Sequence, residues 1–251
     1  TRPITTITSL DQISDTTASL LCFSCGPDEA IEVLPGNIDP RAGQAAHDYL
    51  VAAIDAAQTG HIDGIVTAPL NKAALHAAGI DYPGHTEILA ERCGVADFSM
   101  MLYLPPGNLV QGEYGLGVAH VTLHTSIKSV PDLITSNSIQ EKIGLMDGFL
   151  KRVGHPNPKI GVAALNPHAG EAGLFGDEEQ NKIIPAVLAS QTAGANVHGP
   201  IPADALMRLA AAGKYDGVVA MYHDQGHIAL KLLGYDQAVN ITLGLPIVRT
   251  S

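Results

Sequence analysis

The chain contains, at residues 217–226, the stretch Gly217-Val218-Val219-Ala220-Met221-Tyr222-His223-Asp224-Gln225-Gly226. Its first half is a continuous apolar run of the kind that forms a buried strand. Its second half brings together side chains that bind ligands or transfer protons. In open α/β sheets, active-site residues follow the carboxyl ends of the strands. We therefore expect an α/β fold, and we expect other strands to end in the same way.

Two further apolar runs meet this expectation. Residues 116–123 lead to His124, and residues 159–165 lead to His168. If the strands are parallel, His124, His168 and His223 converge on one edge of the sheet.

The intervening segments have the spacing of helices. Apolar residues recur with a helical period over residues 41–57 and over 130–153, and Asn71 is a suitable cap for a short helix ending near Ala78. Residues 100–104 and 116–123 are predicted to form a hairpin. This alternation favours a largely parallel sheet covered by helices. A dinucleotide-binding G-x-G-x-x-G motif does not follow any predicted strand.

Composition restricts the possible functions. The 251 residues are 46% hydrophobic and carry a formal charge of −11, without a run of Lys or Arg. Nucleic acid and an acidic membrane surface are therefore poor partners, and the apolar segments are too short to span a membrane. With neither a starting Met nor a signal peptide pattern, the sequence predicts a soluble cytoplasmic protein that is part of a longer chain.

The three strand-end histidines are candidate metal ligands. Three neutral imidazoles with an open fourth position suit a catalytic Zn²⁺ or a similar divalent ion, which would act as a Lewis acid on a hydroxyl or carbonyl oxygen. The alternative is a structural role, which is the common one for a single histidine at a strand end. His120 lies deeper in its strand and is expected to be a core or supporting histidine.

Cationic and helix-terminal groups indicate an anionic substrate. The run Pro83-Gly84-His85-Thr86 predicts a turn followed by a helix capped by Thr86. A helix N-terminus attracts anions, although an ordinary capped helix explains the pattern equally well. Lys231, Arg249 and Lys72 are further candidates for binding a carboxylate or phosphate, and a solvated helix position is the alternative for Lys231.

Four runs together resemble the 4-hydroxythreonine-4-phosphate dehydrogenases, the PdxA family of pyridoxal phosphate biosynthesis. They are Pro83-Gly84-His85-Thr86-Glu87, Leu165-Asn166-Pro167-His168-Ala169-Gly170-Glu171, Met221-Tyr222-His223-Asp224-Gln225-Gly226 and Val239-Asn240-Ile241-Thr242-Leu243-Gly244-Leu245-Pro246. The resemblance runs from about Pro35 to Ser251.

The resemblance implies a fold like that of the isocitrate and isopropylmalate dehydrogenases, with two α/β/α domains flanking a cleft. Residues 1–90 with 238–251 would form the terminal, cofactor-side domain, and residues 91–237 the central, dimerisation domain. It further implies a homodimer with a shared active site, with His223 expected to serve the neighbouring subunit.

The implied reaction is the NAD(P)-dependent oxidation of 4-phosphohydroxy-L-threonine. The product is a β-keto acid that loses CO₂ to give 3-amino-2-oxopropyl phosphate. His124, His168 and His223 fall on the family's metal ligands for one Zn, Mg or Co ion per site. The substrate-binding positions correspond to His85, Thr86, Lys231, Asn240 and Arg249. Asp224 and Lys72 are the candidates for the catalytic proton acceptor, and cofactor-binding residues are not identified.

Three departures from the family pattern matter. The family begins with a Gly-Asp-Pro-Ala-Gly-Ile-Gly-Pro-type segment and continues past Arg-Thr-Ser into an Asp-His-Gly-Thr-type segment, and neither is in this sequence. We therefore expect a chain truncated at both ends that binds NAD weakly. Residues 68–72, Ala-Pro-Leu-Asn-Lys, favour the sister branch that acts on 4-phospho-D-threonate or 4-phosphoerythronate in sugar-acid catabolism. A terephthalate dihydrodiol dehydrogenase is disfavoured by His85 and Thr86.

Two other functions are compatible with parts of the pattern. One is a non-catalytic fragment that binds metal and phosphate. The other is a metal-dependent hydrolase, which is weaker because no general-base carboxylate lies at a known spacing. The choice between NAD and NADP and the identity of the metal stay open.

Overall fold

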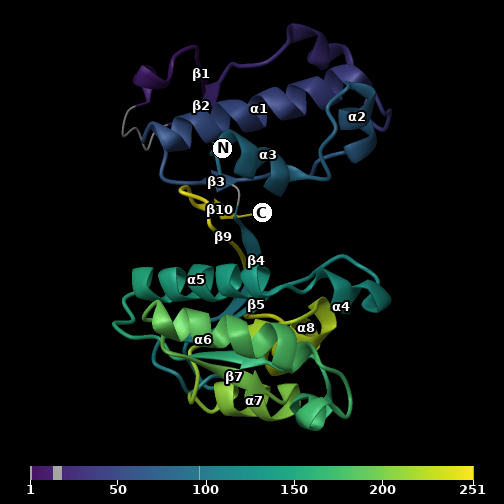
Figure 1. The fold of residues 1–251 in the computed structure, drawn as a ribbon. Helices are drawn as coiled ribbons and strands as arrows, with labels where there is room; N and C mark the ends of the chain where they lie inside the picture. The colour runs from purple at the N-terminus through teal and green to yellow at the C-terminus, as the bar shows by residue number, and fades with distance from the viewer. Residues whose placement is uncertain (1, 14–18, 96, 251) are drawn as a thin grey trace. The chain divides into compact units, whose positions relative to one another are not determined.

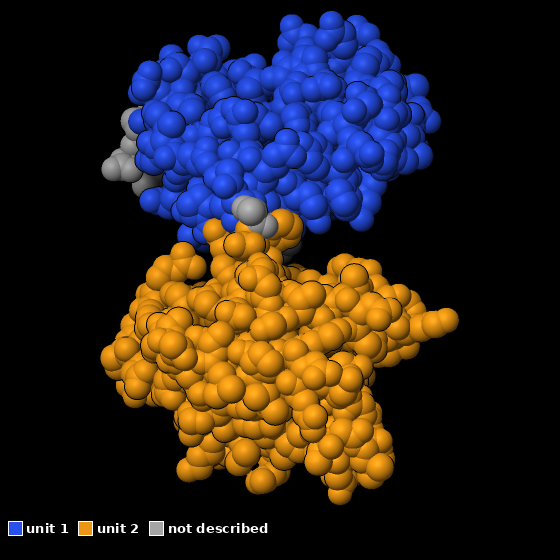
Figure 2. All heavy atoms as spheres, in the orientation of Figure 1, with its two compact units in different colours: residues 1–96, 245–251 blue, residues 97–244 orange. Residues whose placement is uncertain are grey.

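The computed structural model describes residues 2–13, 19–95 and 97–250. It comprises two compact units: unit 1 is Thr1–Ala96 with Leu245–Ser251, and unit 2 is Asp97–Gly244 (Figure 2). Helices and strands occur in both, as the α/β prediction requires. The boundaries of these units, after residues 96 and 244, lie a few residues beyond the predicted ones, after residues 90 and 237. Strand β9 (Val239–Leu243) therefore belongs to the sheet of unit 2.

The described residues of unit 1 form two small parallel strand pairs and three α-helices. Strand β1 (Ile4–Ile7) pairs with β2 (Leu20–Phe23), and β3 (Ile65–Val66) pairs with β10 (Arg249–Thr250). The helices and shorter 3₁₀ turns are α1 (Pro40–Gln58), α2 (Lys72–Ala77), α3 (His85–Arg92), η1 (Leu10–Gln12) and η2 (Asp28–Glu32).

Side chains cap two of these three helices. Asp39 caps α1 by accepting from the Arg41 amide, and Pro40 occupies the first turn, where a missing N–H costs least. Asn71 caps α2 as predicted. The prediction of Thr86 as a cap is wrong, because the N-cap of α3 is Gly84, two residues earlier, in extended backbone, and the helix begins at His85.

The sheet of unit 2 has six strands in the order β7-β6-β8-β5-β4-β9. Strands β7, β6, β8 and β5 are parallel, whereas β4 is antiparallel to both of its neighbours, which confirms the predicted hairpin. The remaining strands are β4 (Ser99–Leu104), β5 (Leu116–His120), β6 (Ile160–Ala163), β7 (Val197–Ile201) and β8 (Gly217–Ala220).

Helices cover both faces of this sheet (Figure 1). They and the shorter turns are η3 (Ile127–Ser129), α4 (Val130–Leu133), α5 (Ser136–Arg152), η4 (Pro167–Gly173), η5 (Glu179–Ile183), α6 (Ile184–Thr192), α7 (Ala203–Ala211) and α8 (His223–Gly234). The single helix predicted over 130–153 is two helices, because Ile134 is extended and Thr135 caps α5 with a capping box.

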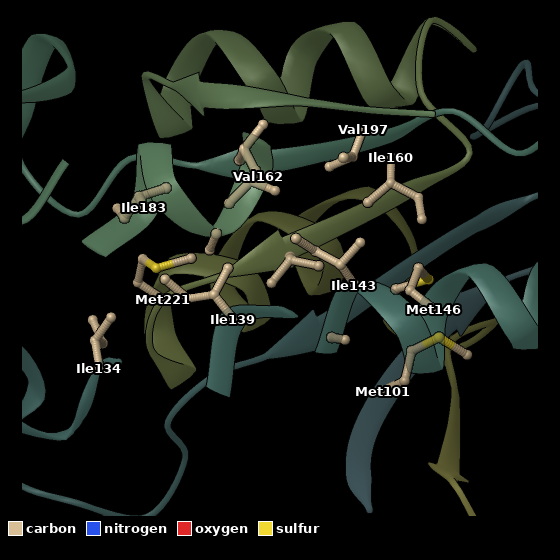
Figure 3. Packing of buried hydrophobic residues seen from close by; sticks show 14 of the residues in the cluster. Met101, Ile134, Ile139, Ile143, Met146, Ile160, Val162, Ile183, Val197 and Met221 are labelled. Carbon is tan, nitrogen blue, oxygen red and sulfur yellow. The ribbon is translucent and has the colours of Figure 1, made fainter. Parts of the chain in front are cut away.

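Alternation along the strands builds two cores, one on each face. Val219 packs with α5 and α6, while its neighbours Val218 and Ala220 pack with α7 and α8. Figure 3 shows the first core, in which Ile139 and Ile143 of α5 lie against Val162 of β6. Successive strand residues point to opposite faces, so this continuous apolar stretch must be buried on both sides.

The topology places the carboxyl ends of β5, β6 and β8 at one edge of the sheet, since these strands are adjacent and parallel. His124, His168 and His223 each follow one of these strands. None of the helices in the described part of the chain is long and apolar enough to cross a bilayer.

Candidate functional site

His124 and His223 lie beside each other within one chain. Strand β5 ends at His120, so His124 lies in the exposed loop that follows, whereas His223 is the first residue of α8. Their ring centroids are 5.9 Å apart. Both line a cavity of about 250 Å³ whose other walls are Leu123, Thr125, Ile127, Val130, Tyr222 and Asp224.

Asp224 contacts the His223 ring directly. Its Oδ1 lies 2.6 Å from Nδ1 of His223. A carboxylate at this position fixes the ring and its tautomer, and it leaves Nε2 as the nitrogen that can bind a ligand. Gln225 braces the same segment, because it accepts from the Met221 amide and donates to the Ala164 carbonyl at the end of β6.

His168 lies in a turn with unusual backbone geometry. Residues 168–172 all have positive φ, and four of them are not glycine. Left-handed backbone costs roughly 1–2 kcal/mol for each non-glycine residue. Such a turn persists only when the surrounding structure holds it, and it presents His168 on an exposed position near Phe175, with ring centroids 6.4 Å apart.

The donor set fits a divalent metal in its chemistry. His124 and His223 supply two adjacent imidazoles, and the Nδ1 bond of His223 is the arrangement common for metal-binding histidines. Within residues 2–13, 19–95 and 97–250, however, there is no group of three or more His, Cys, Asp or Glu side chains that lie close enough together to hold a metal ion. Within this chain, His223 is therefore grouped with His124, and His168 belongs to a separate turn.

Two further histidines, His227 and His120, extend from His223 into the interior of unit 2. The His227 ring stacks on His223 with centroids 3.8 Å apart, and its Nδ1 lies 3.0 Å from Nε2 of the buried His120. His120 is thus a supporting core histidine, as predicted. His227 was not predicted, although it follows His223 by one helical turn and so shares its face.

Burial keeps these two rings neutral. Burial, with the neighbouring His227, lowers the pKa of His120 to about 3, and burial, with the neighbouring His223, lowers that of His227 to about 4. When both rings are neutral, one of the two facing nitrogens can carry a proton and donate it to the other. If both of these nitrogens were protonated, two N–H donors would face each other without an acceptor.

The neutral His120 predicts a pH-dependent stability. The unfolded chain takes up a proton near the ordinary pKa of 6.5, whereas the folded chain does so only near 3. The contribution of His120 is therefore fully present above pH 6.5. It is lost at roughly 1.4 kcal/mol per pH unit as the pH falls from there towards 3. We expect His120→Gln to flatten the pH dependence of the unfolding free energy by about this slope, measured by urea unfolding with a chelator present. An equally steep profile in the variant would contradict the prediction.

A second cluster lies in unit 1, where Arg249 of β10 meets residues after β3. The Nη2 atom of Arg249 donates to Oγ1 of Thr67 at 2.8 Å. Its buried Nε finds no acceptor among the described residues. Burial, reinforced by the charge of Arg249, lowers the pKa of His85. His85 also begins α3, where free amides attract anions. The cluster therefore combines a guanidinium, a hydroxyl and a helix N-terminus, which suits a phosphate or carboxylate.

Beside this cluster lies a cavity of about 530 Å³. Its lining is mainly apolar and comes from α1, η2, β3 with the loop after it, and the start of α3: Ala30, Ile31, Ala42, Ala45, Ala46, Tyr49, Leu50, Ala53, Ile65, Val66, Thr67, Ala68, Pro69, Leu70 and His85.

The other predicted residues lie at the surface of their units. In unit 2, Lys231 is exposed with Nζ 5.6 Å from the Tyr235 ring centroid, and Asn240 is exposed on β9 with a weak contact to the Met100 sulfur. In unit 1, Thr86 is half-buried in the first turn of α3, and Lys72 is exposed at the start of α2. Unit 1 thus brings Arg249 and His85 into one cluster. Unit 2 brings together His124, His223 and Asp224 in another.

Comparison with known proteins gives a consistent set of relatives. Residues 3–251 match the family model described as pyridoxal phosphate biosynthetic protein PdxA. The D-threonate 4-phosphate dehydrogenase of Salmonella typhimurium is 47% identical over 223 residues, covering 89% of this chain and 65% of that protein. The 4-hydroxythreonine-4-phosphate dehydrogenase of Beijerinckia indica is 46% identical over 216 residues, covering 86% and 61%.

The fold has the same relatives. The crystal structure of 4-hydroxythreonine-4-phosphate dehydrogenase from Klebsiella pneumoniae superposes with a TM-score of 0.86 at 43% identity, covering 100% of this chain and 74% of that one. The chain thus spans slightly less than two thirds of the length of the curated relatives it matches.

Proposed function

Because this chain belongs to the PdxA family, we propose that its protein is an NAD(P)- and divalent-metal-dependent dehydrogenase of a 4-phosphorylated 3-hydroxy acid. The hydroxyl at C3 would be oxidised to a ketone while NAD(P)⁺ becomes NAD(P)H and a proton is released. The resulting β-keto acid would then lose CO₂. The observation that carries the proposal is the delivery of His124, His168 and His223 by three adjacent parallel strands in a chain of this family.

Two substrates satisfy this chemistry. Relatives named for D-threonate 4-phosphate are 47% identical, and residues 68–72 also favour that branch. We therefore propose 4-phospho-D-threonate first and 4-phosphohydroxy-L-threonine second, since relatives named for the latter substrate are 46% identical. With the second substrate, the product would be 3-amino-2-oxopropyl phosphate and the pathway pyridoxal phosphate biosynthesis.

Each predicted residue has a role in this proposal. His124, His168 and His223 would hold a Zn, Mg or Co ion, which supplies Lewis acidity toward the substrate oxygens. Asp224 would orient His223, as its 2.6 Å contact with Nδ1 supports, which leaves Lys72 as the proposed acceptor of the hydroxyl proton. His85, Thr86 and Arg249 of unit 1 would bind an anionic end of the substrate. Lys231 and Asn240 of unit 2 are proposed as further substrate-binding residues.

We also propose a cytoplasmic homodimer with a shared active site. The expectation that His223 serves the neighbouring subunit is replaced here, because its ring lies 5.9 Å from that of His124 in the same chain. These two histidines would provide two of the three proposed ligands, and the third would come from a partner subunit.

The decisive experiment is NADH or NADPH formation by the full-length protein with each substrate and each metal. Turnover of 4-phospho-D-threonate at a higher kcat/KM is the expected result. If the protein turns over neither acid, the proposal is wrong. Binding of metal and phosphate without any turnover would instead identify a non-catalytic binding protein, and phosphate release without NADH would identify a hydrolase.

The proposed role of Arg249 in binding the substrate leads to a separate prediction. We expect Arg249→Gln to raise KM for the phosphorylated acid roughly 10- to 100-fold, since hydrogen bonds to charged groups contribute about 1.5–3 kcal/mol. Steady-state kinetics on the full-length protein measures this. The matched control is Arg92→Gln, which removes an exposed arginine of unit 1 that pairs with Asp55. Equal effects of the two substitutions would exclude Arg249 from substrate binding.

A further inference from the structure

Glu179 is a buried carboxylate that lies next to the turn carrying His168. It is only 2% exposed, and charged side chains are rarely buried unless their oxygens are well satisfied. It begins η5, a single wide turn of i→i+5 hydrogen bonding before α6, and such turns are frequent at functional sites.

The carboxylate oxygens of Glu179 accept hydrogen bonds from two of the residues between β6 and the His168 turn. Its Oε1 accepts from the backbone amides of Leu165 and Asn166, both at 2.8 Å. Its Oε2 accepts from Nδ2 of Asn166 at 2.9 Å, and the same Nδ2 donates to Glu178 at 2.7 Å. The start of the turn is thereby fixed by three hydrogen bonds to one side chain.

The turn itself packs against the same carboxylate. A Cβ atom added to Gly170 would lie 2.7 Å from Oε2 of Glu179, so the backbone approaches this oxygen closely. Residues 168–172 are all left-handed, a conformation that the chain does not hold by its own preference. An external contact is therefore required, and Glu179 provides one at both the entry and the middle of the turn.

From these contacts we infer that Glu179 is a positioning residue that holds the left-handed turn and so fixes the location of His168. The inference rests on the proposed function in one point: the proposed function makes His168 a metal ligand. Groups that orient metal ligands typically change metal affinity about 10- to 100-fold when removed.

Two substitutions and a control test the inference. Glu179→Ala removes all three hydrogen bonds, and we expect it to weaken Co²⁺ binding about 10- to 100-fold and to speed amide hydrogen exchange at Leu165 and Asn166. Glu179→Gln keeps an oxygen for the two amides but sets its NH₂ group against Asn166, so a smaller effect on both readouts is expected. Val187→Ala is the matched control. It removes core methyl groups from α6, which should lower the unfolding free energy without changing either readout.

The outcomes separate this inference from the proposed function. If Glu179→Ala leaves exchange at Leu165 and Asn166 unchanged, or if Val187→Ala has the same effects, the inference is wrong. Weakened Co²⁺ binding in His168→Ala without any weakening in Glu179→Ala would also overturn it. If the unsubstituted protein binds no metal, or His168→Ala binds it as well as the unsubstituted protein, the proposed metal site fails. The exchange rates alone then decide whether Glu179 holds the turn.

Discussion

His223→Ala is expected to raise the dissociation constant for Co²⁺ or Zn²⁺ by more than about 100-fold, the upper range for losing a group that merely orients a ligand. His223 combines the features of a ligand: it follows a strand at the edge shared with His124 and His168, and its ring lies near that of His124. Its Nδ1 is also held by Asp224. Equilibrium dialysis with Zn²⁺, or titration with Co²⁺ followed by its visible absorption, measures the affinity.

His198→Ala is the matched control for this experiment. His198 is an exposed histidine of the same unit that lies 3.1 Å from the Asn196 side chain, and its removal should leave metal affinity unchanged. Retention of one tightly bound metal per site in His223→Ala would remove His223 from the ligand set. A similar loss in both variants would indicate scattered surface binding.

Gly226→Ala is expected to lower the unfolding free energy by about 1–3 kcal/mol, the usual range for overpacking a core. A Cβ at this position would lie 2.5 Å from Nε2 of His120 and 2.7 Å from Cγ1 of Val118. Helix α8 would have to move away from the sheet, and His223 and His227 would move with it. Urea unfolding measures the loss of stability, and we expect weaker metal binding in the same variant.

Gly148→Ala provides the control for Gly226→Ala. Gly148 also lies within a helix, α5, but a Cβ there meets no atom within 4 Å. Alanine has the higher helix propensity, so this substitution should stabilise the protein by about 0.5–1 kcal/mol. Equal stability changes of the same sign at both positions would show that the close approach of Gly226 to His120 does not cause the loss of stability in Gly226→Ala.

Features with a local cause could be predicted from the sequence. The period of apolar residues predicted α1, and Asn71 at the start of α2 was identified by its side chain. The strands before His124, His168 and His223 were recognised by their apolar runs, although β5 and β6 end a few residues earlier than predicted, at His120 and Ala163. These signals arise within a few residues of chain. The same reasoning placed the start of α3 two residues too late and merged α4 with α5, because caps depend on backbone geometry that composition only approximates.

Features with a long-range cause could not be predicted in this way. Glu179 looks like an ordinary acidic residue at a helix start, and only the fold shows that it accepts from Leu165 and Asn166. His227 looks like one polar residue among apolar neighbours until α8 sets it against His120. The proposed anion cluster likewise depends on β10 pairing with β3, which brings Arg249 to Thr67 across 182 positions.

The pairing of β10 with β3 also has a consequence for the order of folding. Unit 2 is one uninterrupted segment, Asp97–Gly244, whereas unit 1 needs residues from both sides of it. On the ribosome, β3 therefore waits for its partner strand until residues 249–250 have been made, by which point unit 2 already has every strand of its sheet. Bringing such distant segments together carries a loop-closure entropy that a folded insert reduces, since the insert brings its own ends near each other. The pairing of β3 with β10 thus follows the synthesis of unit 2, and destabilising unit 2 would delay this pairing even when no residue of unit 1 is changed.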